Sequence, residues 1–317
     1  MDIRRRHRLP GLEDRAPLRR EGRGQRAGPA PSPAAGLVDP LAPQTQGWVP
    51  LTAPPIRTLL LAGERPEGDP LADRFGVAAK ALLPIAGRPM ILRVLDALAG
   101  ASTVSSVVVS GARTKLETDA DVTKRMGQVD VEVIESAKTP ATSVVAALDA
   151  FPADDPLLVT TADHALLSSE VVDHFVTAAL EAEADVIVGL ARLETVLETF
   201  PGSRRTAFKF RDGAFCGCNL FLFKSRAARR AALTWRTVET ERKRPLAIVR
   251  RFGLGTLLGY VLRRFTLQDA FTRFSKRIGI RAAPVILPYA MAAVDVDREA
   301  DVELVTSALE NTPRFPG

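Results

Sequence analysis

Residues 56–63 read IRTLLLAG, a short apolar run that ends in alanine and glycine. A run of this length and composition is typical of a strand buried on both faces of a parallel sheet, and the glycine predicts a loop after it. Similar runs follow at 105–111 (SSVVVSG), 156–167 (PLLVTTADHALL) and 184–192 (ADVIVGLAR). We therefore expect a mostly parallel sheet whose first strand begins at residue 56.

Segments with helical spacing of apolar residues separate these strands. They lie at 90–100, at 142–151 and at 168–183, where Ser168 or Ser169 is suited to cap the helix. An alternating run at 129–136 predicts one more strand. The alternation of strands and helices up to residue 192 predicts an α/β fold with helices on both faces of the sheet.

The second half of the body departs from this alternation. Two alternating runs in 206–224 flank Asp212-Gly213, which predicts a β-hairpin. Residues 226–280 read as a basic helical insertion, 281–297 as a return to strand and 298–310 as a last helix. The apolar, basic stretch 254–280 suits either packing on its own domain or peripheral contact with an anionic membrane surface.

The composition separates a tail from a body. Residues 1–55 hold ten of the 23 prolines and nine arginines against five acidic residues, and they show no sustained apolar period. We expect a disordered basic tail over 1–55 and one domain over 56–312. Most of the net charge of +6 comes from the tail, and the body shows no basic face with interleaved aromatics, so we do not expect nucleic-acid binding.

Other classes of protein are also disfavoured. No stretch of about 18 apolar residues predicts a transmembrane helix, and no apolar segment follows the N-terminal arginines as in a secretory signal. The two cysteines, Cys216 and Cys218, are too few for a zinc site and too close for a relaxed disulfide. We expect reduced thiols in a cytoplasmic protein.

Three features fall where predicted strands end, and ligands of parallel α/β sheets bind at the carboxyl ends of strands. The loop after Gly63, together with Lys80, suits phosphate binding, although glycine and lysine are common in loops. Asp163 either caps a turn or binds a metal. Asp295 and Asp297, in AVDVD, share one face of an alternating segment, and Asp297 either caps the next helix or joins Asp163 at Mg²⁺.

These segments together resemble the MobA-like nucleotidyltransferases. The resemblance rests on LAG, KALLPIAGRPMILRVLDAL, LLVTTADHALLSSEVVDHF, GCNLFLF and VDVDREADVELV. It covers 56–192 and 281–310, and in between only Gly217 and Asn219. It implies a GT-A-type, Rossmann-like fold and transfer of a nucleoside monophosphate from a nucleoside triphosphate to a small phosphorylated acceptor, with release of pyrophosphate.

The resemblance also implies roles for individual residues. Lys80 and the LAG residues Leu61, Ala62 and Gly63 would hold the triphosphate, and Ser143 would contact the nucleoside. Asp163 and Asp297 would bind Mg²⁺. Gly217 and Asn219 would meet the acceptor. The cations near the acceptor side suit either an anionic acceptor or a solvated helix face; they are Arg204, Arg205, Arg242, Lys243 and Arg244.

One departure from the family pattern concerns the first loop. Glu64 stands where the family has a second glycine, and the family's loop arginine is replaced by either Arg65 or Arg74. Two rivals follow from the sequence: a nucleotide-sugar-dependent glycosyltransferase, because DVD resembles a D-x-D metal motif, and a non-catalytic nucleotide-binding module, because of Glu64. His164, beside Asp163, is either a base or a structural histidine.

Overall fold

The computed structural model describes residues 55–311, except 65–66, 153 and 242–253. Nearly all of the expected tail over 1–55 lies outside these residues, and so do Arg65, Arg242, Lys243 and Arg244. The boundaries 1–55 and 56–312 stay predictions.

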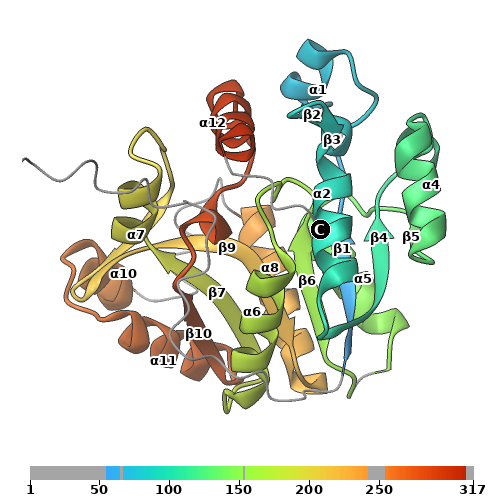
Figure 1. Ribbon diagram of the computed structural model, residues 1–317. Helices are drawn as coiled ribbons and strands as arrows, with labels where there is room; N and C mark the ends of the chain where they lie inside the picture. The colour runs from blue at the N-terminus through green and yellow to red at the C-terminus, as the bar shows by residue number, and fades with distance from the viewer. Residues whose placement is uncertain (1–54, 65–66, 153, 242–253, 312–317) are drawn as a thin grey trace, which may run out of the picture. The chain divides into compact units, whose positions relative to one another are not determined.

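Strands and helices alternate along the first half of the body (Figure 1). The strands are β1 (Ile56–Leu61), β2 (Pro84–Ile85), β3 (Arg88–Pro89), β4 (Val104–Ser110), β5 (Glu132–Ile134), β6 (Leu157–Thr161), β7 (Val186–Arg192), β8 (Ala207–Phe210), β9 (Gly213–Phe223) and β10 (Ala282–Leu287). The helices are α1 (Pro70–Phe75), α2 (Met90–Gly100), α3 (Arg113–Leu116), α4 (Ala120–Gln128), α5 (Pro140–Ala150), α6 (Ser169–Glu181), α7 (Leu193–Thr199), α8 (Arg229–Glu241), α10 (Leu254–Val261), α11 (Leu267–Ile278) and α12 (Glu299–Glu310). Short 3₁₀ turns are η1 (Lys80–Leu82), η2 (Arg226–Ala228) and η3 (Ala290–Ala293).

Eight of the described strands form one sheet in the order β10-β7-β9-β6-β1-β4-β5, and β8 pairs with β9. All neighbours are parallel except β9, which is antiparallel to β6, β7 and β8. The expected mostly parallel α/β sheet with a hairpin is confirmed. The hairpin differs in two ways: its turn is Arg211-Asp212, with Phe210 paired to Gly213, and its second strand lies inside the main sheet.

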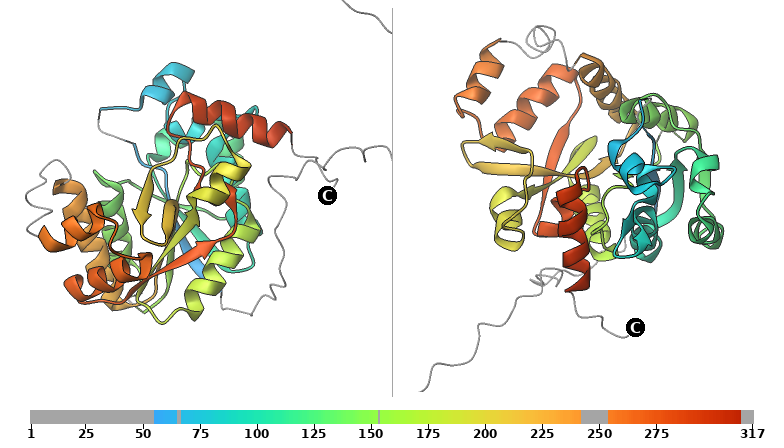
Figure 2. Two further views of the ribbon diagram at one scale, coloured as in Figure 1. Left: turned by 90° about the vertical axis from the view of Figure 1, so that its left-hand side faces the viewer. Right: turned by 90° about the horizontal axis from the view of Figure 1, so that it is seen from above.

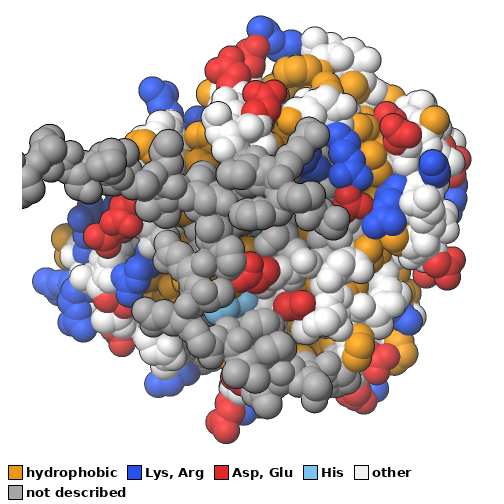
Figure 3. All heavy atoms as spheres, viewed as in Figure 1, with side chains coloured by type: hydrophobic (Ala, Val, Ile, Leu, Met, Phe, Trp, Pro, Cys, Tyr) orange, Lys and Arg blue, Asp and Glu red, His pale blue; other side chains and the backbone are white. Residues whose placement is uncertain are grey.

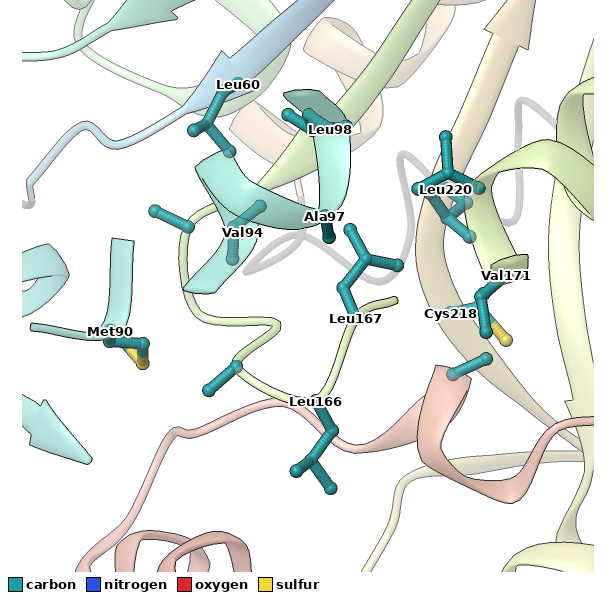
Figure 4. Close-up of a cluster of buried hydrophobic side chains, with 14 of the residues drawn as sticks. Leu60, Met90, Val94, Ala97, Leu98, Leu166, Leu167, Val171, Cys218 and Leu220 are labelled. Atoms are coloured by element: carbon teal, nitrogen blue, oxygen red, sulfur yellow. The ribbon is translucent and has the colours of Figure 1, made fainter. Parts of the chain in front are cut away.

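Helices cover both faces of the sheet, as expected. Leu60 of β1 packs toward α2 and α6, whereas its neighbours Leu59 and Leu61 pack toward α5 and α8. This alternation follows from the two-residue period of a strand. Figure 4 shows part of the first layer, where α2, α6 and the segment after β6 meet the buried side chains of β1 and β9.

Local signals placed most helices but not all. Ser168 caps α6 by accepting from the backbone of Val171, as predicted. α5 begins two residues before the predicted 142–151 segment, because Thr139 is its cap and Pro140 occupies its first turn. The sequence does not predict α1, α3, α4 or α7, and the strand that it predicts over 129–136 is longer than β5.

The predicted insertion 226–280 is helical in its described parts. α11 packs on β10 and α8, with Leu267 buried and Phe271 against the same small cluster. Leu258 and Val261 of α10, and Leu262 just after it, are more than half exposed. Within the described part of the chain, no helix is both long and apolar enough to cross a membrane. On the face shown in Figure 3, visible basic and acidic side chains are interspersed.

Candidate functional site

The segment after β1 begins the site. Leu61 and Ala62 are tied into the sheet, since Ala62 donates to the Ser110 carbonyl and the Leu61 carbonyl accepts from Ala162. Gly63 is the first exposed residue beyond them. A Cβ at Gly63 would lie 3.0 Å from the Cβ of Ser136, so glycine allows the loop before α5 to approach β1 closely.

Lys80 lies at the start of η1, and its side chain joins two distant parts of the chain. The Nζ atom donates to Oδ2 of Asp163 at 3.0 Å and to Oδ1 of Asp297 at 2.8 Å. Burial tends to lower the pKa of the ammonium, but the two carboxylates outweigh it and raise the pKa above its usual value. Lys80 is therefore a permanent cation between two carboxylates, and the three residues predicted from widely separated motifs meet.

The backbone and a hydroxyl fix Asp163. Its Oδ1 accepts from the Thr161 hydroxyl at 2.5 Å, and its carbonyl accepts from the Val296 N–H at 3.0 Å. Val294 and Val296 are fully buried, so Asp295 and Asp297 point the other way. The alternation read from AVDVD is thus present, although β10 ends at Leu287 and η3 precedes the segment, so the strand predicted over 281–297 is shorter than expected.

Asp295 is held by a buried arginine. Arg205, only 5% exposed, donates at 2.6 Å to Oδ1 of Asp295 and at 2.6 Å to Oδ1 of Asp301, and its Nε donates to Ser203. Burial and then the charges of Asp163 and Asp297 raise the pKa of the Asp295 carboxyl, although Arg205 opposes them. The acceptor-binding role predicted for Arg205 stays a prediction, and its contacts give it a positioning role behind Asp295.

A bulge in β9 positions the side chain of Asn219 beside Asp295. Val188 pairs with Phe221 and Leu190 with Gly217, so three residues of β9 oppose Gly189 alone. Asn219 has φ of 50°, a left-handed conformation that asparagine tolerates, and its Nδ2 donates to Oδ2 of Asp295 at 3.3 Å. The bulge therefore places the side chain of Asn219 against Asp295, and its contact with the acceptor stays a prediction.

A cavity of about 740 Å³ opens beside these groups. It includes the predicted Gly217, Asn219, Arg205 and Asp297 among its lining residues. Its volume is within the range of small-molecule sites. The other lining residues come mainly from β7, β8, β9 and the start of α12; they are Val188, Leu190, Arg204, Thr206, Phe208, Cys216, Phe221, Ala293, Asp295, Arg298 and Asp301.

Glu64 and Arg74 both have partners near the first loop. Glu64 forms an ion pair with Lys115 of α3, so its negative charge is matched by a cation of its own. Arg74 pairs with Glu299 at 2.5 Å, which links α1 to α12, the two helices that lie side by side in the left view of Figure 2. The choice between Arg65 and Arg74 as loop arginine stays open, because Arg65 is outside the described residues.

Ser143 and His164 have structural contacts. The Ser143 Oγ accepts from the Ala137 N–H at 2.9 Å and so fixes the loop before α5; its nucleoside contact stays a prediction. His164 is 1% exposed, and its Nε2 lies 3.3 Å from the Met291 carbonyl. Burial lowers the pKa of its imidazole to about 4, so His164 is neutral at pH 7, and its contacts favour the structural alternative.

Comparison with known proteins decides the family. A family model described as the MobA-like NTP transferase domain matches residues 58–264, well over half of the chain. The chain belongs to the MobA-like NTP transferase family. A solved structure from Thermus thermophilus, titled as a hypothetical transferase, is 32% identical to this MobA-like protein, with a TM-score of 0.65 over 78% of this chain and 99% of that one.

More distant structures were also found. A 4-diphosphocytidyl-2C-methyl-D-erythritol synthase from Anaerococcus prevotii is 9% identical, with a TM-score of 0.49 over 81% of this MobA-like chain and 99% of that one. A CMP:2-keto-3-deoxy-manno-octonic acid synthetase complexed with CTP is 13% identical, with a TM-score of 0.46 over the same shares. No curated protein matches the sequence.

Sequence reasoning missed several residues of the site in this MobA-like chain. It left Asp295 out of the predicted site, although the DVD alternation was a usable signal. No sequence pattern marks Lys115, Phe208 or Phe221 as site residues. Only the fold brings Lys115 of α3 to the loop after β1, and only the fold places Phe208 and Phe221 of the hairpin at the cavity.

Proposed function

We propose that the protein is an Mg²⁺-dependent nucleotidyltransferase that transfers a nucleoside monophosphate from a triphosphate to a small phosphorylated acceptor. The family supplies the general reaction class. The observation that carries the finer proposal is the convergence of Lys80, Asp163 and Asp297, of which Asp297 lines the cavity.

The two carboxylates suit Mg²⁺. Asp163 and Asp297 both reach one cation, the Lys80 ammonium, at 3.0 and 2.8 Å, so one small region attracts positive charge from two sides. Among the described residues no group of three or more His, Cys, Asp or Glu side chains forms a metal site. Mg²⁺ fits such a pair because it takes one or two carboxylates and completes its shell with phosphate oxygens and water. When bound, it would neutralise charge on the triphosphate.

The protein's own residues would position and stabilise charge. An acceptor phosphate oxygen attacks the α-phosphorus, a new P–O bond forms, and the bond from the α-phosphorus to the bridging oxygen breaks, so pyrophosphate leaves with the electron pair. Lys80 would offset the charge of the triphosphate, and Asn219 would orient the acceptor from the bulge. The acceptor phosphate is largely ionised at pH 7, so no base is required. His164, buried and neutral, is not needed.

The structure bears on the two rivals. Glu64, which motivated the binding module, has its charge matched by Lys115. The glycosyltransferase alternative rests on Asp295 and Asp297 acting together as a D-x-D metal motif. Asp295 instead contacts Arg205 and Asn219, whereas Asp297 contacts Lys80, so the two carboxylates have different partners.

A pyrophosphate-release screen tests the proposal. Purified protein with Mg²⁺ is offered CTP, GTP, UTP and ATP, each against a panel of phosphorylated small molecules, with Asp163→Asn as the inactive control. Release that requires one triphosphate, one acceptor and intact Asp163 is the expected result. Nucleoside diphosphate released from a nucleotide sugar would instead identify a glycosyltransferase, and triphosphate binding without turnover of any acceptor would favour the binding module.

A further inference from the structure

The cavity beside Asp295 has polar groups that are mostly paired with each other. Arg205 donates to Ser203, Asp295 and Asp301. Asp301, 4% exposed, also accepts from the backbone of Arg298, and the amide of Asn219 donates to Asp295. The donors of Arg205 are therefore directed at the protein's own groups and not at the cavity.

Apolar side chains form much of the remaining wall. Val188 and Leu190 come from β7, Phe208 from β8 and Phe221 from β9. The ring of Phe221 stacks on Trp235, with centroids 5.4 Å apart, so this part of the wall is held in place from behind. Phe208 is 49% exposed at the cavity, although burial of a phenylalanine side chain is favourable.

One cation in the lining is free to bind a phosphate. Arg298 donates to the Arg204 carbonyl and pairs with Asp301. The guanidinium of Arg204 is exposed and has no ion pair or hydrogen bond with any residue that the structure describes. Arg204 is thus the cavity's unpaired positive charge, on a segment that leads directly into the wall containing Phe208.

We propose that the acceptor is a phosphomonoester with an apolar body, which lies against Val188, Leu190, Phe208 and Phe221 while Arg204 contacts its phosphate. This inference rests on the proposed function and names the substrate class of the same site. A sugar or polyol phosphate would bring hydroxyls against these four apolar side chains, which offer no donor or acceptor, and each unpaired hydroxyl buried there is unfavourable.

Calorimetric titration of the full chain tests the inference without relying on turnover. Hexyl phosphate and glucose 6-phosphate have six carbons each and differ in hydroxyls. Each is titrated in the presence of Mg²⁺, first alone and then with the α,β-methylene analogue of CTP, GTP, UTP or ATP, which cannot release pyrophosphate. Butyl, octyl and 2-phenylethyl phosphate are titrated in the same way. We expect hexyl phosphate to bind more tightly than glucose 6-phosphate, with affinity rising about fourfold per methylene from butyl to octyl.

Two variants locate the binding. Phe208→Ser should weaken hexyl phosphate several-fold and reduce the dependence on chain length, whereas Leu197→Ser, at a side chain 38% exposed on α7 away from the cavity, should not. Because Phe208 is half exposed, Phe208→Ser is expected to fold, and far-UV circular dichroism checks this. If 2-phenylethyl phosphate binds more tightly than hexyl phosphate, the apolar part of the acceptor is aromatic, and the inference is still supported.

The contrary results are distinct from failure of the proposed function. Tighter binding of glucose 6-phosphate, or an affinity independent of chain length, overturns the apolar acceptor even if pyrophosphate is released with a sugar phosphate. Tight, Phe208-dependent binding of hexyl phosphate with no pyrophosphate release from any triphosphate leaves the apolar acceptor standing and removes the transferase proposal.

Discussion

Lys80 and Asp297 lie 217 residues apart in the chain, yet the Lys80 ammonium donates to the Asp297 carboxylate at 2.8 Å. The same ammonium contacts Asp163 at 3.0 Å. The contact joins the start of the domain to its last helix, because Asp297 directly precedes the N-terminal end of α12.

Replacement of Lys80 by methionine should abolish most activity. The change keeps the stem of the side chain and removes the cation between two carboxylates. We expect pyrophosphate release to fall by about 10²–10³-fold, the usual effect of losing one group that stabilises transition-state charge. The exposed Lys276→Met on α11 is the matched control. Turnover in Lys80→Met equal to that of the control would exclude Lys80 from the mechanism.

The adjacent residues Arg204 and Arg205 should have different roles: Arg205 contributes to the stability of the fold, and Arg204 contributes to acceptor binding. Arg205→Met removes the buried cation from Asp295 and Asp301, which keep only Asn219 and Arg298 as side-chain partners, so we expect the free energy of unfolding to fall by about 1–3 kcal/mol in urea denaturation. Arg204→Met, at an exposed side chain, should change it by less than about 0.5 kcal/mol and raise the KM for the acceptor. Equal loss of stability in both variants would contradict this division.

The ion pair of Glu64 with Lys115 predicts an asymmetric effect on triphosphate binding. Lys115→Met leaves the Glu64 carboxylate without its cation close to the loop after β1, so we expect a higher KM for the triphosphate. Glu64→Gln should leave that KM almost unchanged, and the double variant should resemble Glu64→Gln. The pair is partly exposed, so its coupling in a stability cycle should stay below about 1 kcal/mol. Equal KM changes in both single variants would mean that Lys115 does not offset the charge of Glu64 at the triphosphate.

The two thiols should be slow to react in the folded protein. Burial raises the pKa of the Cys216 thiol and, more strongly, that of Cys218, so both are protonated at pH 8. A chromogenic disulfide reagent should modify two thiols quickly in denaturant and far more slowly in native protein, with Cys218→Ser identifying the order. A raised thiol pKa stabilises the fold up to about pH 9 and loses that effect as the pH rises further. Rapid native labelling at pH 7 would contradict the buried, protonated state.

The bulge in β9 should depend on a glycine in β7. A Cβ at Gly189 would lie 3.1 Å from that of Leu220, so Gly189→Ala forces the bulge to shift and should cost about 1–3 kcal/mol of stability. Gly217→Ala is the control for stability, because its added Cβ would meet no atom within 4 Å other than those of its chain neighbours. The Gly189 variant should also lose activity by displacing Asn219. Identical denaturation midpoints for both variants would show that the bulge tolerates the added methyl group.

The α/β fold was readable from the sequence because its signals are local. IRTLLLAG and the runs like it are apolar on successive residues, and Ser168 precedes a helical period. These patterns depend on burial and capping within a few residues. α3 and α4 were missed, and the inner position of β9 could not be predicted, since an 11-residue alternating strand suits an edge or an interior equally well.

The candidate site divides in the same way. The sequence by itself indicated Lys80, Asp163 and Asp297, because their residue types stand beside recognisable segments, whereas Asn219 was predicted only through the resemblance to the MobA-like family. Only the tertiary structure decided that Lys80 bridges the two aspartates, that Arg205 is buried while Arg204 is free, and that Lys115 matches Glu64. Those relationships are contacts between residues tens to hundreds of positions apart. Charge pairing and burial act through space, and the chain encodes them only after the sheet has placed its strands side by side.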